Sequence, residues 1–177
     1  MTHRILLHEA AHAVIAHELG VPLNYIDIVT GEGGEILEGS AHFGYGDDDY
    51  EFWTRYENSI QCQIDLAGMV CDSLSHSGIY EACMKAGREM RDLDLDFPPD
   101  WVDDHYEADL EMLMWRLRSD DEWEASFTRL WGETLEKVMK KLPTIQRVSE
   151  RLESPIRLWG REFLQLIESP QSQLLAA

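Results

Sequence analysis

The segment from residue 2 to residue 20 constrains the fold most, because it combines a helical pattern with a sharp stop. Thr2 is suited to cap the helix N-terminus, and Gly20 followed by Pro22 is suited to end it. Apolar side chains follow one another at helical spacing, namely Ile5, Leu6, Ala13, Val14 and Ile15. The sequence therefore predicts a helix with one apolar face packed against a core.

This predicted helix contains His8-Glu9-Ala10-Ala11-His12. Consecutive residues of an α-helix are rotated by about 100°, so His8 and His12 lie about 40° apart on one face. Two imidazoles at this spacing can bind one zinc ion, and Glu9 stands to the side as a general base. The alternative is a core helix whose histidines hydrogen-bond to neighbours. A third histidine six residues after His12 is absent, which argues against a metzincin-type site.

The composition limits the partners that the protein is expected to bind and the cell compartment in which it is expected to work. The formal charge of -19 disfavours binding to nucleic acid or anionic membranes and favours a basic or neutral partner. Neither a run of about 18 apolar residues nor a basic start followed by an apolar segment is present, so we expect no membrane span, no signal peptide and a cytoplasmic location. Cys62, Cys71 and Cys83 lack C-x-x-C spacing and are predicted to be reduced, mostly buried thiols.

A small β-hairpin is predicted after the first helix. Residues 25–30 have the alternation of a strand, residues 31–34 form a turn, and residues 36–45 return antiparallel. The second strand would leave a free edge near the metal, where an extended peptide can bind through backbone hydrogen bonds. The acidic residues 47–49 are expected to cap the next helix.

The remainder of the chain is predicted to be largely helical. Apolar residues at three- and four-residue spacing indicate helices over residues 51–75, 103–118, 120–142 and 144–167. Pro143 is expected to separate the last two, giving a C-terminal helical hairpin, and Pro155 to kink the second of them. Their aromatic stripe is predicted to pack on the core; an oligomer interface or a partner groove is the alternative.

An acidic stretch at residues 91–104 contains Pro98-Pro99 and is predicted to be a loop. Asp92, Asp94 and Asp96 alternate there, which raises calcium binding as an alternative. The oxygen-rich twelve-residue loop with its glycine and terminal glutamate is missing, so a solvated loop is favoured.

The predicted fold class is mainly α (α+β) in a single domain, which suits a chain of 177 residues. Residues 1–118 would form the core and residues 119–177 the C-terminal helices packed on it. Catalytic zinc takes three protein ligands, so His8 and His12 need a third. A thermolysin-like glutamate about twenty residues downstream is unattractive, since Glu32 and Glu35 fall in the predicted hairpin.

Several segments, in chain order, resemble those of one known family. Residues 8–16 are similar to a helix with the pattern H-E-A-G-H-A, and residues 26–29 with 41–45 to a strand and its substrate-binding edge. Residues 66–72 are similar to L-A-G-R-x-A-E, and residues 107–110 to S-x-N-D-L. The family is that of the FtsH-type ATP-dependent zinc metalloproteases, whose peptidase domain the chain resembles over residues 1–118.

This resemblance implies a helical, zincin-like peptidase fold with zinc bound by His8, His12 and Asp109. Asp72 takes the place of a glutamate in the family pattern, and the resemblance implies that it is either a hydrogen-bond partner of a ligand or an alternative ligand. Ala11 replaces a glycine, which a helix tolerates. The acidic insertion at residues 91–104 lengthens the path from Asp72 to Asp109.

The sequence thus predicts a zinc-dependent endopeptidase that hydrolyses unfolded or flexible polypeptides by a zinc-activated water with Glu9 as general base. No G-x-x-x-x-G-K-[ST] phosphate loop occurs in these residues, so a separate ATPase or adaptor is an expected partner. A homo-oligomer is also expected, either a ring as in the family or a dimer through the terminal helices. His42, His76 and His105 are the candidates for stabilising the oxyanion.

Two other functions are compatible with the same residues. One is a non-catalytic interaction or regulatory protein that keeps zinc for folding, or keeps only the fold. The other is metal-dependent hydrolysis of a non-peptide substrate. Glu9 favours catalysis, because a purely structural zinc site does not need it.

Overall fold

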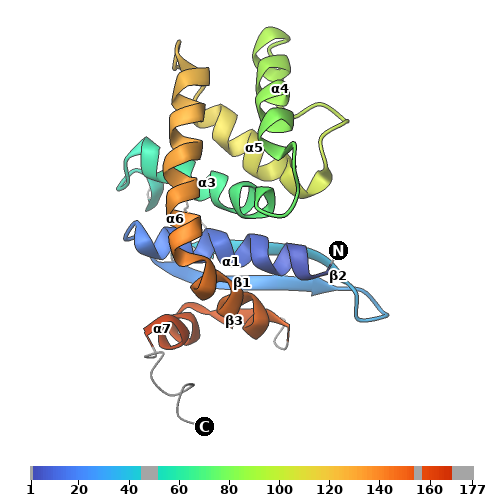
Figure 1. Ribbon diagram of the computed structural model, residues 1–177, viewed down its shortest axis with the longest axis vertical. Helices are drawn as coiled ribbons and strands as arrows, with labels where there is room; N and C mark the ends of the chain where they lie inside the picture. The colour runs from blue at the N-terminus through green and yellow to red at the C-terminus, as the bar shows by residue number, and fades with distance from the viewer. Residues whose placement is uncertain (1, 45–51, 154–156, 169–177) are drawn as a thin grey trace.

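The computed structural model describes residues 2–44, 52–153 and 157–168 (Figure 1). Over these residues the protein is mainly helical, with six helices and one small antiparallel sheet, which confirms the predicted mainly α class. The elements in chain order are α1 (Thr2–Glu18), β1 (Leu23–Thr30), β2 (Ile36–Phe43), α3 (Asn58–Ser73), α4 (Ile79–Asp92), α5 (Asp104–Arg116), α6 (Trp123–Leu152), β3 (Arg157–Trp159) and α7 (Gly160–Glu168).

The helix α1 lies inside the molecule, between the sheet and the helices α3 and α6 (Figure 1). Every residue from Ala10 to Ala16 is buried, and the small alanine side chains permit the neighbouring elements to approach closely. The helix stops at Gly20 as predicted. Gly20 has a left-handed φ of 78°, and the Val21 amide donates to the Ala16 carbonyl at 2.8 Å. The predicted Thr2 cap lies outside the described side chains.

The sheet has the strand order β2-β1-β3. β1 and β2 form the predicted hairpin, in which Ile26 lies opposite Ala41 and Ile28 opposite Gly39. Both isoleucines are buried, so a one-residue slip in register would turn them out of the core. Within the described chain β2 is an edge strand, as predicted.

The prediction of one helix over residues 144–167 is wrong, because the structure has the end of α6, the strand β3 and the helix α7 in this region. Leu158 is buried opposite Ile26, and the Arg157 guanidinium donates to the Asp27 carboxylate at 2.6 Å. Residues far apart in sequence make these contacts, so a local apolar pattern does not reveal them. The kink predicted at Pro155 lies outside the described residues.

The predicted break at Pro143 is wrong, because α6 continues through it as one helix of 30 residues. Proline removes one backbone donor, so the carbonyl four residues earlier loses its helical partner. Pro143 is exposed, which lets water reach this part of the helix. A long helix followed by β3 and α7 thus replaces the predicted C-terminal hairpin.

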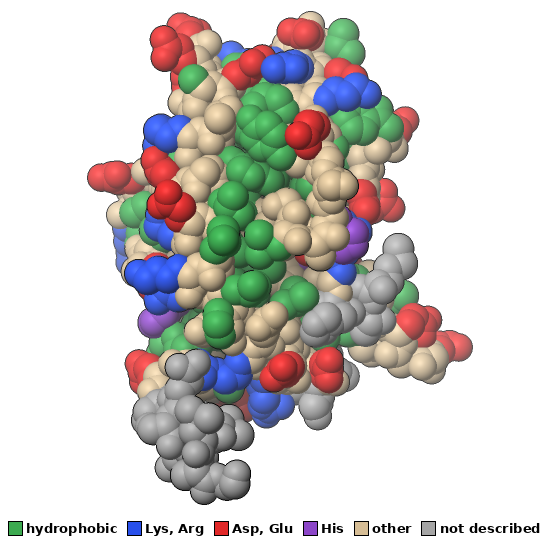
Figure 2. All heavy atoms as spheres, in the orientation of Figure 1, with side chains coloured by type: hydrophobic (Ala, Val, Ile, Leu, Met, Phe, Trp, Pro, Cys, Tyr) green, Lys and Arg blue, Asp and Glu red, His purple; other side chains and the backbone are tan. Residues whose placement is uncertain are grey.

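The predicted aromatic stripe does pack on the core. Trp123, Phe127 and Trp131 of α6 are buried, and Phe127 stacks on Trp131 with ring centroids 5.8 Å apart. Figure 2 shows hydrophobic side chains gathered between α6 and α4, with charged side chains toward the edges of this face. Tyr80 of α4 packs edge-on against Trp131 at 5.2 Å. The contact between Tyr80 and Trp131 therefore joins α4 to α6.

The middle of the chain departs from the prediction at its boundaries. The helix expected over residues 51–75 is shorter, since α3 begins at Asn58. The Gln61 side-chain amide donates to the carbonyls of Trp53 and Tyr56, which ties the preceding turn against α3. The helix α4 was not predicted, and the acidic cap predicted at residues 47–49 lies outside the described residues.

The predicted acidic loop between α4 and α5 is present. The Arg118 guanidinium lies 3.5 Å from the Asp94 carboxylate and 3.8 Å from that of Asp96. An arginine therefore balances these charges, which disfavours the calcium alternative. These side chains are exposed, as expected of a solvated loop.

Candidate metal centre

The structure brings together His8 and His12 of α1 with Asp109 of α5. The Oδ2 atom of Asp109 lies 2.8 Å from Nε2 of His8 and 3.2 Å from Nε2 of His12. The two histidines are buried, whereas Asp109 is partly exposed. Three ligand atoms thus converge within 4.8 Å of one another, as a single metal ion requires.

The second nitrogen of each imidazole is already engaged. Nδ1 of His12 donates to the Ile64 backbone carbonyl at 2.7 Å, and Nδ1 of His8 to Oδ2 of Asp72 at 3.2 Å. With the proton held on Nδ1, the neutral ring presents its Nε2 lone pair. Both rings therefore direct Nε2 toward Asp109, and a ring that releases its Nε2 proton there is left in the tautomer that binds a metal.

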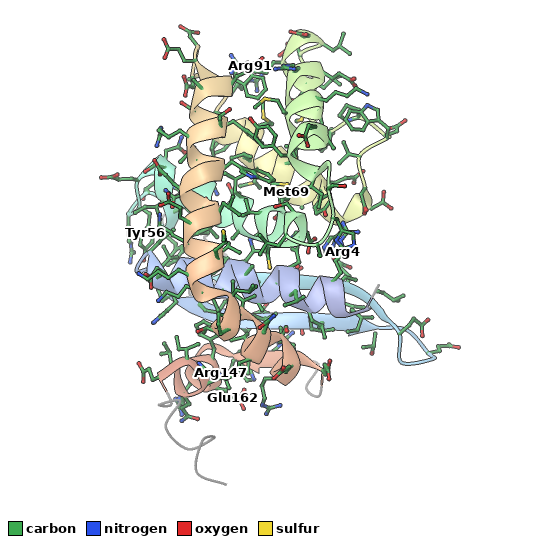
Figure 3. The ribbon with its side chains drawn as sticks, in the orientation of Figure 1. Arg4, Tyr56, Met69, Arg91, Arg147 and Glu162 are labelled. Atoms are coloured by element: carbon green, nitrogen blue, oxygen red, sulfur yellow. The ribbon has the colours of Figure 1, made fainter. Side chains whose placement is uncertain are left out.

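Asp72 lies behind His8 and is surrounded by donors. Besides His8, its Oδ2 accepts from Nε of Arg4 at 3.1 Å and from the Tyr106 hydroxyl at 3.2 Å. Figure 3 shows Arg4 near the N-terminal end of α1, on the side of α3 and α5. A guanidinium this close repels a cation. Between the two roles implied for Asp72, the geometry favours that of a hydrogen-bond partner over that of a ligand.

His105 forms a second group of potential ligands with His8 and Asp72. Its ring centroid lies 4.1 Å from that of His8, and its Nε2 lies 3.4 Å from Oδ2 of Asp72. This nitrogen is buried, and apart from that contact to Asp72, which is not aligned as a hydrogen bond, it has no polar partner among the described residues. The Arg4 guanidinium disfavours a cation here too, so the group around Asp109 is the better metal site.

Hydrogen bonds and charges set the protonation of the centre. Burial lowers the pKa of His8, but hydrogen bonds to Asp109 and Asp72 outweigh it and raise this pKa to about 10. Burial likewise opposes protonation of His12, yet the charge of Asp109 raises its pKa. For Asp109 the effect of burial is outweighed by the two histidines, which hold the carboxyl pKa well below its usual range. The group is thus charge-balanced by protons that a metal ion can replace.

Glu9 lies beside this group, buried between α1 and β2. Its Cγ lies so near the β2 backbone that a Cβ added at Gly39 would be 2.6 Å away. Burial raises the pKa of Glu9, with the neighbouring histidines acting in the opposite direction. A carboxyl with a raised pKa is better matched to accept and return a proton near neutral pH.

An open cleft of about 1300 Å³ contains the centre. Its lining includes residues of α1, α3, α5 and β1 and the whole length of β2. Among the lining residues, the Arg116 guanidinium donates to Asp65 at 2.6 Å. Burial raises the pKa of Asp65 to about 6, moderated by this arginine. The three candidate ligands and Glu9 therefore face a channel bordered by β2, whose outer edge is unpaired among the described residues.

The other histidines proposed from sequence differ in position. His105 and His42 line the cleft, and His42 stacks on Tyr25 at 4.3 Å. His76 contacts the Asp72 backbone carbonyl at 3.3 Å and is not among the cleft residues. His105 is therefore the histidine nearest to the proposed ligands, and His76 is the least suited to contact a substrate.

The three cysteines are buried free thiols, as predicted. Burial raises the pKa of each thiol to about 12, so none is poised as a thiolate.

Three groups that hydrogen-bond to Asp72 or His12 were not predicted from the sequence, namely Arg4, Tyr106 and the Ile64 carbonyl. Arg4 precedes His8 by four residues and so shares its helix face, which was a usable signal. A backbone carbonyl leaves no signal in the sequence.

Comparison with models of known families and with curated proteins found no match. Among the described residues, no helix has both the length and the apolar character needed to cross a membrane.

Proposed function

We propose that this protein is a zinc-dependent endopeptidase of the FtsH peptidase type that acts on unfolded or flexible polypeptides. One observation carries the proposal: two correctly oriented imidazoles, a carboxylate and the buried Glu9 converge in a cleft bordered by a free strand edge. A purely structural zinc site is normally closed by four protein ligands, whereas three ligands in an open cleft leave room for a substrate.

The residues fit zinc by their chemistry. Two histidines and one aspartate form a donor set that this ion accepts once it replaces the Nε2 protons, and His12 and His8 have their outer nitrogens fixed by the Ile64 carbonyl and Asp72. Bound zinc would supply a Lewis acid that polarises the scissile carbonyl and makes water more acidic.

Glu9 then performs the proton transfers. Its carboxylate accepts a proton from the attacking water and returns it to the leaving amine. Its burial beside the histidines excludes bulk water from the carboxylate and raises its pKa toward the working range.

The free edge of β2 suits an extended polypeptide. In the described part of the chain β2 is paired on one side only, with β1, so outward backbone groups of residues 36–43 can bond to a substrate strand. A folded domain does not offer such a strand, which is why unfolded segments are the proposed substrates. Delivery by a separate ATPase or adaptor is part of the same proposal.

The first test measures metal. We expect close to one zinc per chain in the purified protein, lost in His8→Ala and His12→Ala. Thermal unfolding of both variants with excess chelator separates a lost site from a lost fold. An absence of bound zinc under zinc-replete conditions would sink the proposal.

The second test measures cleavage of an unfolded protein by the wild type and by Glu9→Gln. The substitution keeps the shape but removes the base, so we expect at least a 100-fold loss of kcat with zinc retained. Equal activity would reject the assignment of Glu9. Zinc binding without any cleavage by the wild type would favour the non-catalytic, zinc-binding alternative.

A further inference from the structure

Two glycines approach the His8-Glu9 pair from different elements. Gly68 lies in the middle of α3, where a Cβ atom would overlap Nε2, Cδ2 and Cε1 of the His8 ring. Gly39 lies in β2, where a Cβ atom would be 2.6 Å from Cγ and 3.2 Å from Cδ of Glu9. Neighbouring residues of one helix thus depend on two separate glycines.

The His8 ring has little room to move away from an added methyl group. Asp109 and Asp72 hold its two nitrogens at 2.8 and 3.2 Å, and the tilted His105 ring packs against it with ring centroids 4.1 Å apart. The ring is also almost wholly buried. A side chain at position 68 must therefore push Nε2 off its position near Asp109, or push α3 away from α1.

The Glu9 side chain is confined in a similar way. It is buried under β2, and a Cβ at position 39 would also lie 3.0 Å from Cγ2 of Ile5 on the preceding turn of α1. Contacts below 3.0 Å are not tolerated, so either the carboxylate turns or the strand lifts. Either movement changes the distance between Glu9 and the cleft edge.

We infer that Gly68 and Gly39 are positioning residues that set the two halves of the centre independently, Gly68 the metal ligand His8 and Gly39 the base Glu9. The role of Gly39 in catalysis rests on the proposed function. The role of Gly68 depends only on the metal site and on the packing of His8.

The experiment compares Gly68→Ala and Gly39→Ala with Gly132→Ala as control. Gly132 lies in α6 with nothing within 4 Å of an added Cβ. The measurements are zinc affinity by competition with a chelating dye, the absorption spectrum of the cobalt-substituted protein, and kcat on an unfolded protein.

We expect Gly68→Ala to weaken zinc binding by more than 100-fold and to alter the cobalt spectrum. Gly39→Ala should keep zinc affinity within about threefold while kcat falls at least 100-fold, as for Glu9→Gln. Gly132→Ala should change neither. Wild-type zinc affinity in Gly68→Ala, or wild-type kcat in Gly39→Ala, overturns the corresponding assignment.

A double-mutant cycle in chelator tests Gly68 even if the protein binds no zinc. Gly68→Ala should lower the Tm of the wild type, but by less than half as much in a His8→Ala background, where the ring is gone. Equal decreases in both backgrounds overturn the inference for Gly68. If the wild type binds no zinc, the proposed function is overturned. The difference in Tm between the two backgrounds then still tests whether Gly68 positions His8.

Discussion

The two histidines of the centre are held by different kinds of partner. His8 is oriented by a side-chain network, in which Asp72 is itself bonded to Arg4 and Tyr106. His12 is oriented by the Ile64 backbone carbonyl, part of the helix α3. The outer nitrogen of His8 is therefore fixed by a charged side chain, whereas that of His12 is fixed by main chain.

This difference decides which substitutions can change the orientation of each histidine. A substitution at Asp72 removes the acceptor that fixes His8, because the acceptor is a side chain. No substitution at position 64 removes the carbonyl that fixes His12, because every amino acid, proline included, keeps its backbone carbonyl. The orientation of His8 should thus be tunable by mutation, and that of His12 should persist as long as α3 packs on α1.

The largest effect should come from Asp109, the proposed ligand that lies against both histidines. Asp109→Ala removes an oxygen that lies within 3.2 Å of both Nε2 atoms, so we expect zinc affinity to fall by more than the 10–100-fold typical of outer partners. Competition with a chelating dye measures the affinity. A smaller loss in Asp109→Ala than in Asp72→Ala would reverse our ligand assignment.

Asp72→Asn should have the next largest effect, on the His8 side alone. The amide keeps the size of the carboxylate but loses the charge that stabilises the His8 tautomer, so we expect zinc affinity to fall about 10–100-fold. A crystal structure of the variant should show the His12 to Ile64 bond intact. Unchanged affinity would mean that packing, rather than Asp72, orients His8.

Local patterns predicted the part of the centre that lies on one helix. The spacing of His8 and His12, the stop at Gly20 and the β1–β2 hairpin all depend on neighbours in sequence, and the structure shows α1 and the hairpin. Asp109 lies about 100 residues further along the chain and was proposed only from a family resemblance. A local pattern of apolar residues does not show that α5 comes close to α1.

The predicted fold was wrong where contacts between distant residues form an element, or where burial outweighs a local signal. Proline usually ends a helix, but burial of α6 on both sides of Pro143 outweighs the loss of one hydrogen bond. β3 depends on pairing with β1 across 130 residues, as the bond from Arg157 to Asp27 shows. The positions of Gly68 and Gly39 against His8 and Glu9 likewise follow only from how the elements cross.

In the metal-free protein, the two histidines should also respond differently in their titration. The pKa of His8 is raised in the folded state from 6.5 to about 10, so its protonation contributes stability that is fully present below pH 6.5 and lost as the pH rises through about 10. Asp72→Asn should lower the His8 midpoint by about one pH unit or more and change that of His12 less. Nuclear magnetic resonance of the imidazole signals measures both. Equal changes at the two rings would contradict the separation of the two regions.

The smallest effect should come from Ile64→Val, which tests the main-chain side of the comparison. Ile64 is buried, so removing one methylene should cost about 1 kcal/mol of unfolding free energy. The carbonyl that accepts from His12 remains, and zinc affinity should therefore stay within about twofold of the wild type. Denaturant unfolding in chelator measures the stability, and dye competition the affinity. A loss of affinity as large as that of Asp72→Asn would show that the His12 region depends on side-chain packing, and the distinction between the two regions would no longer hold.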